Sequence, residues 1–532
     1  MVAGDGVVSH GLAIACISGT ATQRQSTQSK GALMTNLASM VPASAARNPS
    51  GVVIKLDDLE MTFGALEVLS AKVAALLAQR GVKPGDRVAL ISPNLPQMPP
   101  IYYGILRYGA IVVPLNPLLK SREVAYHLKD SGAVLAFAWE GVLGEVEPGA
   151  AEAGAAIIAI DGNFMTLLAP LEAVSEVAAA EKDDTAVILY TSGTTGKPKG
   201  AELTHENLRS NAEVSTALFS SREGDVIFGG LPFFHIFGQT CALNSAVMAG
   251  ATVTLLPRFD PVKALEIIAR DKVTIFEGVP SMYIALLRAP GRDNYDLSSL
   301  RLAASGGSAL PVEILHEFET TFKATLLEGY GLSETSPVVA FNQMDGIRKP
   351  GSVGTAVAGA QLRIVNDAGA DVEPGAVGEI AVAGPYVMKG YWNNPEATAA
   401  AIPDGWFRTG DLARQDEDGV FFIVDRKKDM ILRGGYNIYP REIEEVLYEH
   451  PAVAEAAVVG RPDDVHGEEV CAAVALKEGA QGADDPEALA AEIQEFVKAR
   501  IAAYKYPRKV VIMEALPKGP TGKILKREIS IP

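Results

Sequence analysis

Short apolar segments alternate with amphipathic helical patterns over a long stretch of the chain, from about residue 62 to residue 331. The apolar segments have the length and residue types of buried strands. They lie at 87–91, 110–114, 134–138, 155–160, 186–190, 251–256, 273–277 and 324–328. Residues 68–80 and 262–270 carry apolar side chains at helical spacing. This alternation predicts βαβ units on parallel sheets, with too many strands for a single sheet.

The pattern changes twice further along the chain. Residues 361–365, 378–383 and 420–424 are strand-like and separated by turn-rich stretches, which is typical of antiparallel hairpins. The region after residue 425 predicts a helix at 440–449, strands at 454–459 and 470–476, and a long helix at 486–503. We therefore expect an α/β fold with a large N-terminal domain of parallel βα sheets, an antiparallel β subdomain, and a small mobile α+β C-terminal domain.

The same changes set the expected domain boundaries. A chain of 532 residues is too long for one compact core. Its Ser/Thr/Gln-rich start predicts a disordered extension at 1–33, followed by a large domain at 34–424. The segment 425–429 is charged and lacks the Pro, Gly and Ser content of a passive linker, so we expect a hinge there. The C-terminal domain would then cover 430–532.

Charge and composition narrow the classes of function. The net charge of -17 disfavours nucleic acid as a partner, and requires local basic clusters for any anionic substrate. Cys16, Cys241 and Cys471 lie far apart without a CxxC spacing, which argues against a disulfide framework or a zinc site and fits the reducing cytoplasm. No apolar run reaches the roughly 18 residues of a transmembrane helix. Peripheral membrane contact through a lipid substrate and oligomerisation both stay open.

The strongest local signal is the segment Tyr-Thr-Ser-Gly-Thr-Thr-Gly-Lys-Pro-Lys-Gly at 190–200, directly after the predicted strand at 186–190. Its glycines let the backbone turn tightly and expose N–H groups, while its hydroxyls and lysines add donors and positive charge. Such a loop is suited to holding a polyphosphate. It is not a Walker A loop, because Pro198 follows Lys197 and no glycine precedes Gly196 by five positions.

This segment resembles the signature loop of the adenylate-forming superfamily, which includes acyl-CoA synthetases, coumarate–CoA ligases and luciferases. The family's other motifs follow in the same order, and the resemblance extends from about residue 34 to the C-terminus. They lie at 233–238, 305–308, 329–337, 409–411, 425–440 and 520–523. Within this superfamily, the sequence most resembles those of bacterial fatty-acid–CoA ligases. The resemblance implies that residues 34–424 form the AMP-binding domain and residues 430–532 a C-terminal lid.

The resemblance also implies a two-step reaction. An acid and ATP give acyl-AMP and pyrophosphate, and acyl-AMP and CoA then give acyl-CoA and AMP. A carboxylate is a poor electrophile, so the first step must bring anions together while charge grows on the leaving group. Metal and cationic groups are needed where that charge develops. We therefore expect Mg²⁺ as cofactor, with ATP and CoA as co-substrates and a carboxylic acid as the third small-molecule partner.

The catalytic residues implied by the resemblance are Lys523, Glu334 and His235. The Lys523 ammonium would contact the attacking carboxylate and the bridging oxygen of the α-phosphate. Glu334, helped by Thr191, would bind Mg²⁺, which prefers oxygen ligands. His235 lies between apolar neighbours, and we interpret it as a gate of the acyl pocket and not as a general base.

The nucleotide site implied by the resemblance is larger. Tyr330 would pack against the adenine, Asp411 would accept hydrogen bonds from the ribose hydroxyls, and Arg426 would contact the same nucleotide. The full ATP- and AMP-binding set is Thr191, Ser192, Gly193, Thr194, Thr195, Gly196, Lys197, Gly307, Ser308, Glu328, Gly329, Tyr330, Gly331, Ser333, Asp411, Arg426 and Lys523.

The second half-reaction requires a rearrangement, because Lys523 would occupy the side from which the thiol attacks. The resemblance places the hinge at Lys428. Rotation would bring Arg433, Gly434 and Gly435 to the adenylate, where the two glycines leave a narrow channel for the pantetheine of CoA.

The acyl pocket implied by the motifs is formed by apolar or small residues. These are Phe233, His235, Ile236, Phe237, Gly306, Gly331, Pro337 and Val338. No acidic residue occurs in 231–240, which disfavours an amino acid substrate. A medium- or long-chain fatty acid is favoured over an aryl acid such as a cinnamate. A luciferase-like monooxygenase shares every motif and stays an alternative, whereas a non-enzymatic nucleotide-binding module would need neither Lys523 nor 433–435.

Overall fold

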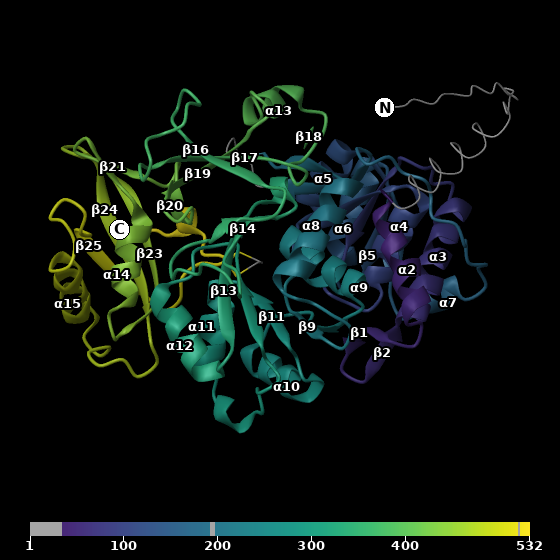
Figure 1. The fold of residues 1–532 in the computed structure, drawn as a ribbon, viewed down its shortest axis with the longest axis horizontal. Helices are drawn as coiled ribbons and strands as arrows, with labels where there is room; N and C mark the ends of the chain where they lie inside the picture. The colour runs from purple at the N-terminus through teal and green to yellow at the C-terminus, as the bar shows by residue number, and fades with distance from the viewer. Residues whose placement is uncertain (1–34, 192–196, 520–521, 532) are drawn as a thin grey trace, which may run out of the picture.

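The computed structural model describes residues 35–191, 197–519 and 522–531. Two large sheets carry most of the fold, and Figure 1 shows them with helices packed around them. The first sheet has the strand order β18-β8-β7-β4-β3-β5-β6. Its strands are β3 (Arg87–Ile91), β4 (Ile111–Leu115), β5 (Ala133–Trp139), β6 (Ala156–Ile160), β7 (Thr185–Thr191), β8 (Lys199–Thr204) and β18 (Gly390–Tyr391). The run from β7 to β6 is parallel, while β8 and β18 add antiparallel strands at one edge.

The second sheet has nine strands in the order β15-β14-β13-β12-β11-β9-β10-β1-β2. They are β1 (Val52–Leu56), β2 (Leu59–Thr62), β9 (Val226–Gly229), β10 (Thr252–Leu255), β11 (Ile275–Gly278), β12 (Leu302–Ser305), β13 (Thr325–Gly331), β14 (Val338–Phe341) and β15 (Thr355–Ala356). Its centre is parallel, and both edges are antiparallel. The predicted parallel sheets are therefore confirmed, but the antiparallel edge strands were missed.

Helices cover these sheets where the sequence alternates. They include α2 (Met40–Arg47), α3 (Phe63–Gln79), α4 (Met98–Tyr108), α5 (Ser121–Ser131), α6 (Leu143–Ala153), α7 (Phe164–Leu168), α8 (His205–Leu218), α9 (Ser245–Ala249), α10 (Pro261–Asp271), α11 (Pro280–Arg288) and α12 (Val312–Phe322). The start of α10 follows from its sequence, because the Asp260 side chain accepts the Lys263 N–H and Pro261 is preorganised for the first turn. Gly104 of α4 packs so closely on α3 that an added Cβ would lie 2.5 Å from the Cβ of Val73.

The antiparallel subdomain follows in the chain and bridges toward the C-terminal part. Its strands, in the order β16-β17-β19-β20, are β16 (Gln361–Val365), β17 (Gly378–Ala383), β19 (Phe407–Gln415) and β20 (Phe421–Arg426). The short helix α13 (Pro395–Ala401) precedes β19. The first two strands have the predicted bounds, which confirms the hairpin interpretation of this region.

The C-terminal part lies on the left of Figure 1, opposite the N-terminal helices, and has its own core. Its elements are β21 (Ile431–Arg433), β22 (Tyr436–Ile438), α14 (Pro440–Tyr448), β23 (Val453–Asp463), β24 (Gly467–Leu476), α15 (Pro486–Lys498) and β25 (Lys509–Met513). The predicted long helix ends at Lys498 instead of residue 503, because Ile501 and Tyr504 turn back to pack on this core. The predicted α/β class with a small α+β C-terminal part is confirmed. Among the described helices, none has the length and apolar character needed to cross a bilayer.

Candidate active site

A cavity of about 1030 Å³ lies where the two large sheets, the antiparallel subdomain and the C-terminal segment meet. Most of the predicted site residues line it. They are Thr191, His235, Ile236, Phe237, Gly306, Gly307, Gly329, Tyr330, Gly331, Ser333, Glu334, Pro337, Val338, Asp411, Arg426, Lys428 and Lys523. Residues 192–196 of the predicted phosphate loop lie outside the described residues. The β7–β8 hairpin that carries this loop places Thr191 at the cavity wall and leaves Lys197 exposed outside it.

Lys523 enters this cavity from a tight turn near the C-terminus. The Gly519 N–H donates to the Lys523 carbonyl at 2.8 Å. Gly522 adopts a φ of +78°, which residues with a Cβ atom rarely adopt. The Ser281 hydroxyl of α11 donates to the Gly522 carbonyl at 2.9 Å, which anchors the turn on the large domain. Burial, aided by the nearby Arg426 guanidinium, lowers the pKa of Lys523 to about 8.

His235 lies close enough to Lys523 for the ammonium charge to affect the pKa of its ring. Burial, and to a smaller extent the Lys523 ammonium, lowers the pKa of His235 to about 4. Its Nδ1 accepts the Phe237 N–H at 3.3 Å, so the imidazole is neutral and tied to its own turn. A neutral ring with such a low pKa is a weak base, which supports a wall or gate role over proton transfer.

A charged pair and a tyrosine form another part of the cavity wall, close to Lys523. Asp411 on β19 pairs directly with Arg426 on β20, so the strand register alone brings the two side chains together. The Arg426 Nε lies 3.1 Å from one Asp411 carboxylate oxygen, and the Tyr330 hydroxyl donates to the other at 2.6 Å. The arrangement fixes a buried carboxylate beside an aromatic ring, as a nucleoside site requires.

Glu334 lies on a short turn and gathers two hydroxyl groups. Its Oε1 accepts from the Thr191 hydroxyl at 3.2 Å and from the Tyr391 hydroxyl at 3.0 Å. Burial of Glu334 leaves about 9% of it exposed. Carboxylate and hydroxyl oxygens are the donors that Mg²⁺ prefers, so Glu334 and Thr191 fit a magnesium ion between this turn and β7.

Several residues of the cavity wall were not predicted, and two of them adjoin predicted site residues. Tyr391 contacts Glu334, and its ring lies 5.1 Å from the Lys199 ammonium. It belongs to a two-residue strand that reaches β8 from almost two hundred residues away, and no local pattern marks that pairing. Phe234 also lines the cavity, and only the turn geometry separates it from its buried neighbour Phe233.

Besides Lys197, three predicted nucleotide- or acyl-site residues lie outside the cavity wall. Phe233, predicted for the acyl pocket, is fully buried, because its N–H is held by Asn94 at 2.9 Å and the turn directs Phe234 into the cavity instead. Glu328, predicted for the base and ribose, is buried behind the wall, where it accepts the Leu310 N–H at 3.0 Å. Ser308 is half-buried and also lies off the wall, beyond the turn at Gly307.

The predicted CoA-channel residues also lie away from the cavity in this arrangement. Arg433 forms an ion pair with Glu469, its Nε lying 2.6 Å from the carboxylate. Gly434 and Gly435 form the β21–β22 turn with φ values of +57° and +84°. The Gly434 N–H donates to the His466 carbonyl at 2.8 Å, which ties the turn to β24.

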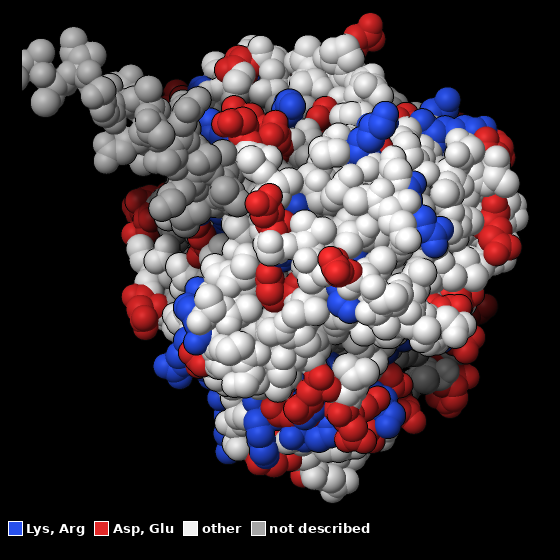
Figure 2. Space-filling view, turned by 90° about the vertical axis from the view of Figure 1, so that its right-hand side faces the viewer, with Lys and Arg blue, Asp and Glu red and all other residues white. Residues whose placement is uncertain are grey.

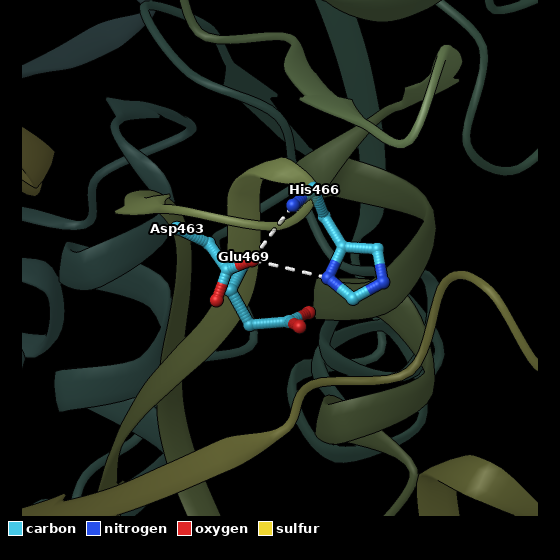
Figure 3. Close-up of side chains that lie close together, drawn as sticks. All are labelled: Asp463, His466 and Glu469. Atoms are coloured by element: carbon cyan, nitrogen blue, oxygen red, sulfur yellow. Dashed lines mark hydrogen bonds and ion pairs between the residues drawn. The ribbon is translucent and has the colours of Figure 1, made fainter.

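A group of potential metal ligands sits beside this turn. Figure 3 shows Asp463, His466 and Glu469, whose ligand atoms lie within 4.8 Å of one another. Asp463 already accepts from the His466 ring and backbone at 3.0 and 2.8 Å, and Glu469 is engaged by Arg433. We therefore interpret the group as the hydrogen-bonded end of the β23–β24 hairpin.

The surface charge bears on how anionic substrates are met. Figure 2 shows the face that carries the N-terminal helices, where acidic and basic side chains are interspersed among uncharged ones. No broad basic patch marks the described part of this face. Cationic side chains are instead grouped in the cavity, where the lining includes Lys199, Arg408, Arg426, Lys427, Lys428, Lys523 and Arg527.

Comparison with known proteins agrees with this geometry. The AMP-binding enzyme family matches residues 41–392, and the AMP-binding enzyme C-terminal domain matches residues 442–523. A long-chain-fatty-acid–CoA ligase of Bacillus subtilis (strain 168) is 41% identical, covering 93% of this chain and 94% of that protein. An indoleacetate–CoA ligase of Aromatoleum aromaticum is 36% identical, covering 93% and 97%.

Solved structures give the same result. An anthranilate CoA ligase in complex with anthranoyl-AMP superposes with a TM-score of 0.88 at 30% identity, covering 92% of this chain and 96% of that chain. ATP-bound MatB from Rhodopseudomonas palustris gives 0.86 at 32% identity, covering 93% and 97%. The chain therefore belongs to the AMP-binding enzyme family and is an AMP-forming acid–CoA ligase of the adenylate-forming superfamily.

Proposed function

We propose that this ligase activates a medium- or long-chain fatty acid. The observation that carries the proposal is the joint placement of Lys523, the Glu334–Thr191 pair and the Asp411–Arg426 pair around one cavity whose remaining wall is largely apolar. That apolar wall includes Phe219, Leu231, Phe234, Val338 and Phe341. Apolar walls with a few placed polar groups are typical of sites for small molecules with an apolar body.

An aryl acid is the second candidate. The Phe237 ring packs directly on Gly306, where an added Cβ would lie 3.2 Å from it, so an aromatic ring that can stack with a flat group borders the cavity. Curated relatives act on both kinds of acid, since they include an indoleacetate–CoA ligase and a feruloyl-CoA synthase besides the fatty-acid enzymes.

In the adenylation step that we propose, each group has one task. Lys523 binds the attacking carboxylate and the α-phosphate, and the Asp411–Tyr330–Arg426 group holds the nucleoside. Glu334 and Thr191 would hold Mg²⁺, which supplies positive charge to the phosphates when bound. Burial of the site strengthens each of these electrostatic contacts, because water no longer screens them.

In the thioester step that we propose, the C-terminal part rotates about Lys428. This motion would replace Lys523 with Arg433, Gly434 and Gly435 at the adenylate. In the present arrangement Arg441 of α14 donates to the Ile423 carbonyl at 2.7 Å. A few such polar contacts hold the C-terminal part in place, and interfaces of this kind permit relative domain motion.

The proposed substrate class is tested by measuring pyrophosphate release with a panel of acids, with and without CoA. We expect fatty acids of medium or long chain to give the highest kcat/KM, with acyl-CoA formed only when CoA is present. Higher values for cinnamates would transfer the proposal to aryl acids. Light emission during turnover would instead indicate a luciferase-like monooxygenase.

Glu334→Gln is expected to raise the Mg²⁺ concentration needed for half-maximal adenylation by about tenfold or more, since even an outer partner of a metal ligand is worth about 10- to 100-fold in affinity. The amide keeps the shape of the side chain but loses its charge. Glu317→Gln is the matched control, because Glu317 pairs with Arg288 outside the cavity. Full adenylation by Glu334→Gln at low Mg²⁺, with an unchanged Tm, would remove Glu334 from the metal site.

The rate of adenylation is expected to fall as the pH rises through about 8, the lowered pKa of Lys523. The ammonium form binds the two anions, and above this pH the side chain is increasingly neutral. Lys523→Arg should lose the decline, because a guanidinium stays protonated. Single-turnover adenylation across the range from about pH 6 to about pH 10 measures both profiles. A flat wild-type profile would contradict the role of the Lys523 charge.

A further inference from the structure

Tyr391 is a cavity residue that the proposed mechanism does not use. It lies on the two-residue strand β18, and its hydroxyl donates to Glu334 Oε1 at 3.0 Å. The centre of its ring lies 5.1 Å from the Lys199 ammonium, a distance at which a cation is attracted to an aromatic ring. One side chain therefore contacts both the proposed metal ligand and a cation of the cavity wall.

The backbone around this tyrosine joins the two elements that carry its partners. The Met388 N–H donates to the Glu334 carbonyl at 2.8 Å, and the Trp392 N–H donates to the Gly200 carbonyl of β8 at 2.7 Å. Between these two contacts, β18 pairs antiparallel with β8. We call residues 388–392 the strap, because they tie the Glu334 turn to the β7–β8 hairpin.

Side chains outside the cavity wall anchor the strap. The buried Asn207 side chain of α8 donates to the carbonyls of Pro385 and Val387, just before the strap, at 2.6 and 3.1 Å. The Thr398 hydroxyl accepts the Tyr391 N–H at 2.8 Å. None of these contacts uses the phenol of Tyr391, so the strap does not need that hydroxyl to keep its place.

Two hydroxyl groups orient the Glu334 carboxylate. Its Oε1 accepts from the Thr191 hydroxyl and from the Tyr391 hydroxyl, and these donors come from two different strands. Thr191 and Lys199 are register partners on β7 and β8, so the two contacts of the Tyr391 side chain meet at one end of the same hairpin. Residues that orient a metal ligand by hydrogen bonding change metal affinity about 10- to 100-fold.

We propose that Tyr391 is a positioning residue for adenylation, which orients Glu334 toward Mg²⁺ through its hydroxyl and holds the Lys199 ammonium against its ring. The proposal rests on the metal role that the proposed function gives to Glu334, and deepens it by naming the residue that aligns this ligand. The hydroxyl acts on the metal ligand, whereas the ring acts on a cation that lines the cavity. Because the two contacts use different parts of one side chain, substitutions can separate them.

The experiment measures the Kd of ATP by calorimetry without any acid, once with saturating Mg²⁺ and once with EDTA. The ratio of the two values gives the contribution of the metal to ATP affinity. We expect Tyr391→Phe to reduce this ratio about tenfold, because the hydroxyl is lost. The Kd in EDTA should not change, because the phenyl ring keeps its contact with Lys199. Tyr391→Leu should reduce the ratio equally and raise the Kd in EDTA by about three- to tenfold, because the ammonium loses its ring.

Tyr108→Phe is the matched control, because the Tyr108 hydroxyl donates to the Val82 carbonyl at 2.7 Å and does not line the cavity. It should leave both Kd values unchanged. Tyr391→Phe combined with Glu334→Gln tests whether the hydroxyl acts through Glu334, since residues that share one contact have non-additive effects. We expect this double variant to have the same ratio as Glu334→Gln alone. Tyr391→Phe removes a single oxygen atom, so it decides the test if the Leu variant folds poorly.

Two results would overturn the proposal while leaving the proposed function intact. One is a wild-type ratio in Tyr391→Phe, which would reduce Tyr391 to a structural part of the strap. The other is additive effects in the double variant, which would show that the hydroxyl does not act through Glu334. Failure of the proposed function looks different. A wild-type ratio in Glu334→Gln would remove the metal site itself, and a wrong substrate class would not affect a measurement that contains no acid.

Discussion

Lys523→Ala is expected to slow acyl-adenylate formation about a hundredfold, while thioester formation from supplied acyl-AMP is largely spared. Removing one preorganised group that stabilises developing charge typically costs about 3 kcal/mol of transition-state stabilisation, which corresponds to that factor in rate. The Gly519 N–H donates to the Lys523 carbonyl and the Ser281 hydroxyl donates to the Gly522 carbonyl, so truncation of the Lys523 side chain should leave these backbone contacts in place.

The matched control is Lys518→Ala, five residues before Lys523 in the same C-terminal segment. Lys518 pairs with Glu455 at 2.6 Å and does not line the cavity, so its removal changes the net charge equally without touching the site. Single-turnover kinetics of each half-reaction measures both variants. Equal losses in the two half-reactions of Lys523→Ala would show that Lys523 supports the fold or the domain arrangement and not the adenylation step.

The sequence predicts the parallel sheets well, because buried parallel strands are continuous apolar runs between amphipathic helices. The strands at the sheet edges are not predicted, because they lack such continuous apolar runs. The strands β1 and β2 have no regular alternation, since only Val53, Ile54 and Met61 among their residues are buried, and the two-residue strands β15 and β18 are too short to show a pattern. Their pairing depends on segments far away in the chain, which local periodicity does not contain.

Site residues were predictable where a motif specifies both the type of residue and the backbone element that carries it. Asp411 and Arg426 meet because they are register partners, and Glu334 meets Thr191 because the short turn Ser333–Thr335 and the end of β7 lie at one cavity. Phe233, predicted for the acyl pocket, is buried off the cavity wall, because a single turn directs Phe234 into the cavity instead. Tyr391 carried no local signal.

Glu277, a fully buried residue of β11, is marked in the sequence by its charge and not by a family motif. An acidic residue at the end of the apolar strand predicted at 273–277 breaks the pattern of a fully buried strand. Such a violation of local consistency is expected mainly at functional or strained positions. Its physical cost became visible only once the structure showed that neither oxygen has a partner among the described residues.

Lys428→Pro is expected to leave adenylation largely intact and to abolish transfer of the acyl group to CoA. Lys428 lies in the turn after β20, where the Asp429 N–H donates to the Arg426 carbonyl at 2.9 Å. The present arrangement holds Lys523 in the cavity and Arg433 outside it, so it is the one suited to adenylation. Proline fixes φ near −65° and restricts the preceding residue as well, which opposes the backbone rotation that a hinge must make.

The control for Lys428→Pro is Lys428→Ala, because the Lys428 side chain lines the cavity and its charge contributes to the lowered pKa of Lys523. Alanine removes the charge but keeps the backbone free, so both half-reactions should proceed if the hinge role is correct. The measurement is single-turnover kinetics with acyl-AMP formed in the enzyme or supplied. If both variants slow adenylation and both transfer the acyl group to CoA at the wild-type rate, Lys428 acts through its ammonium on ATP, and the rotation must occur at another residue.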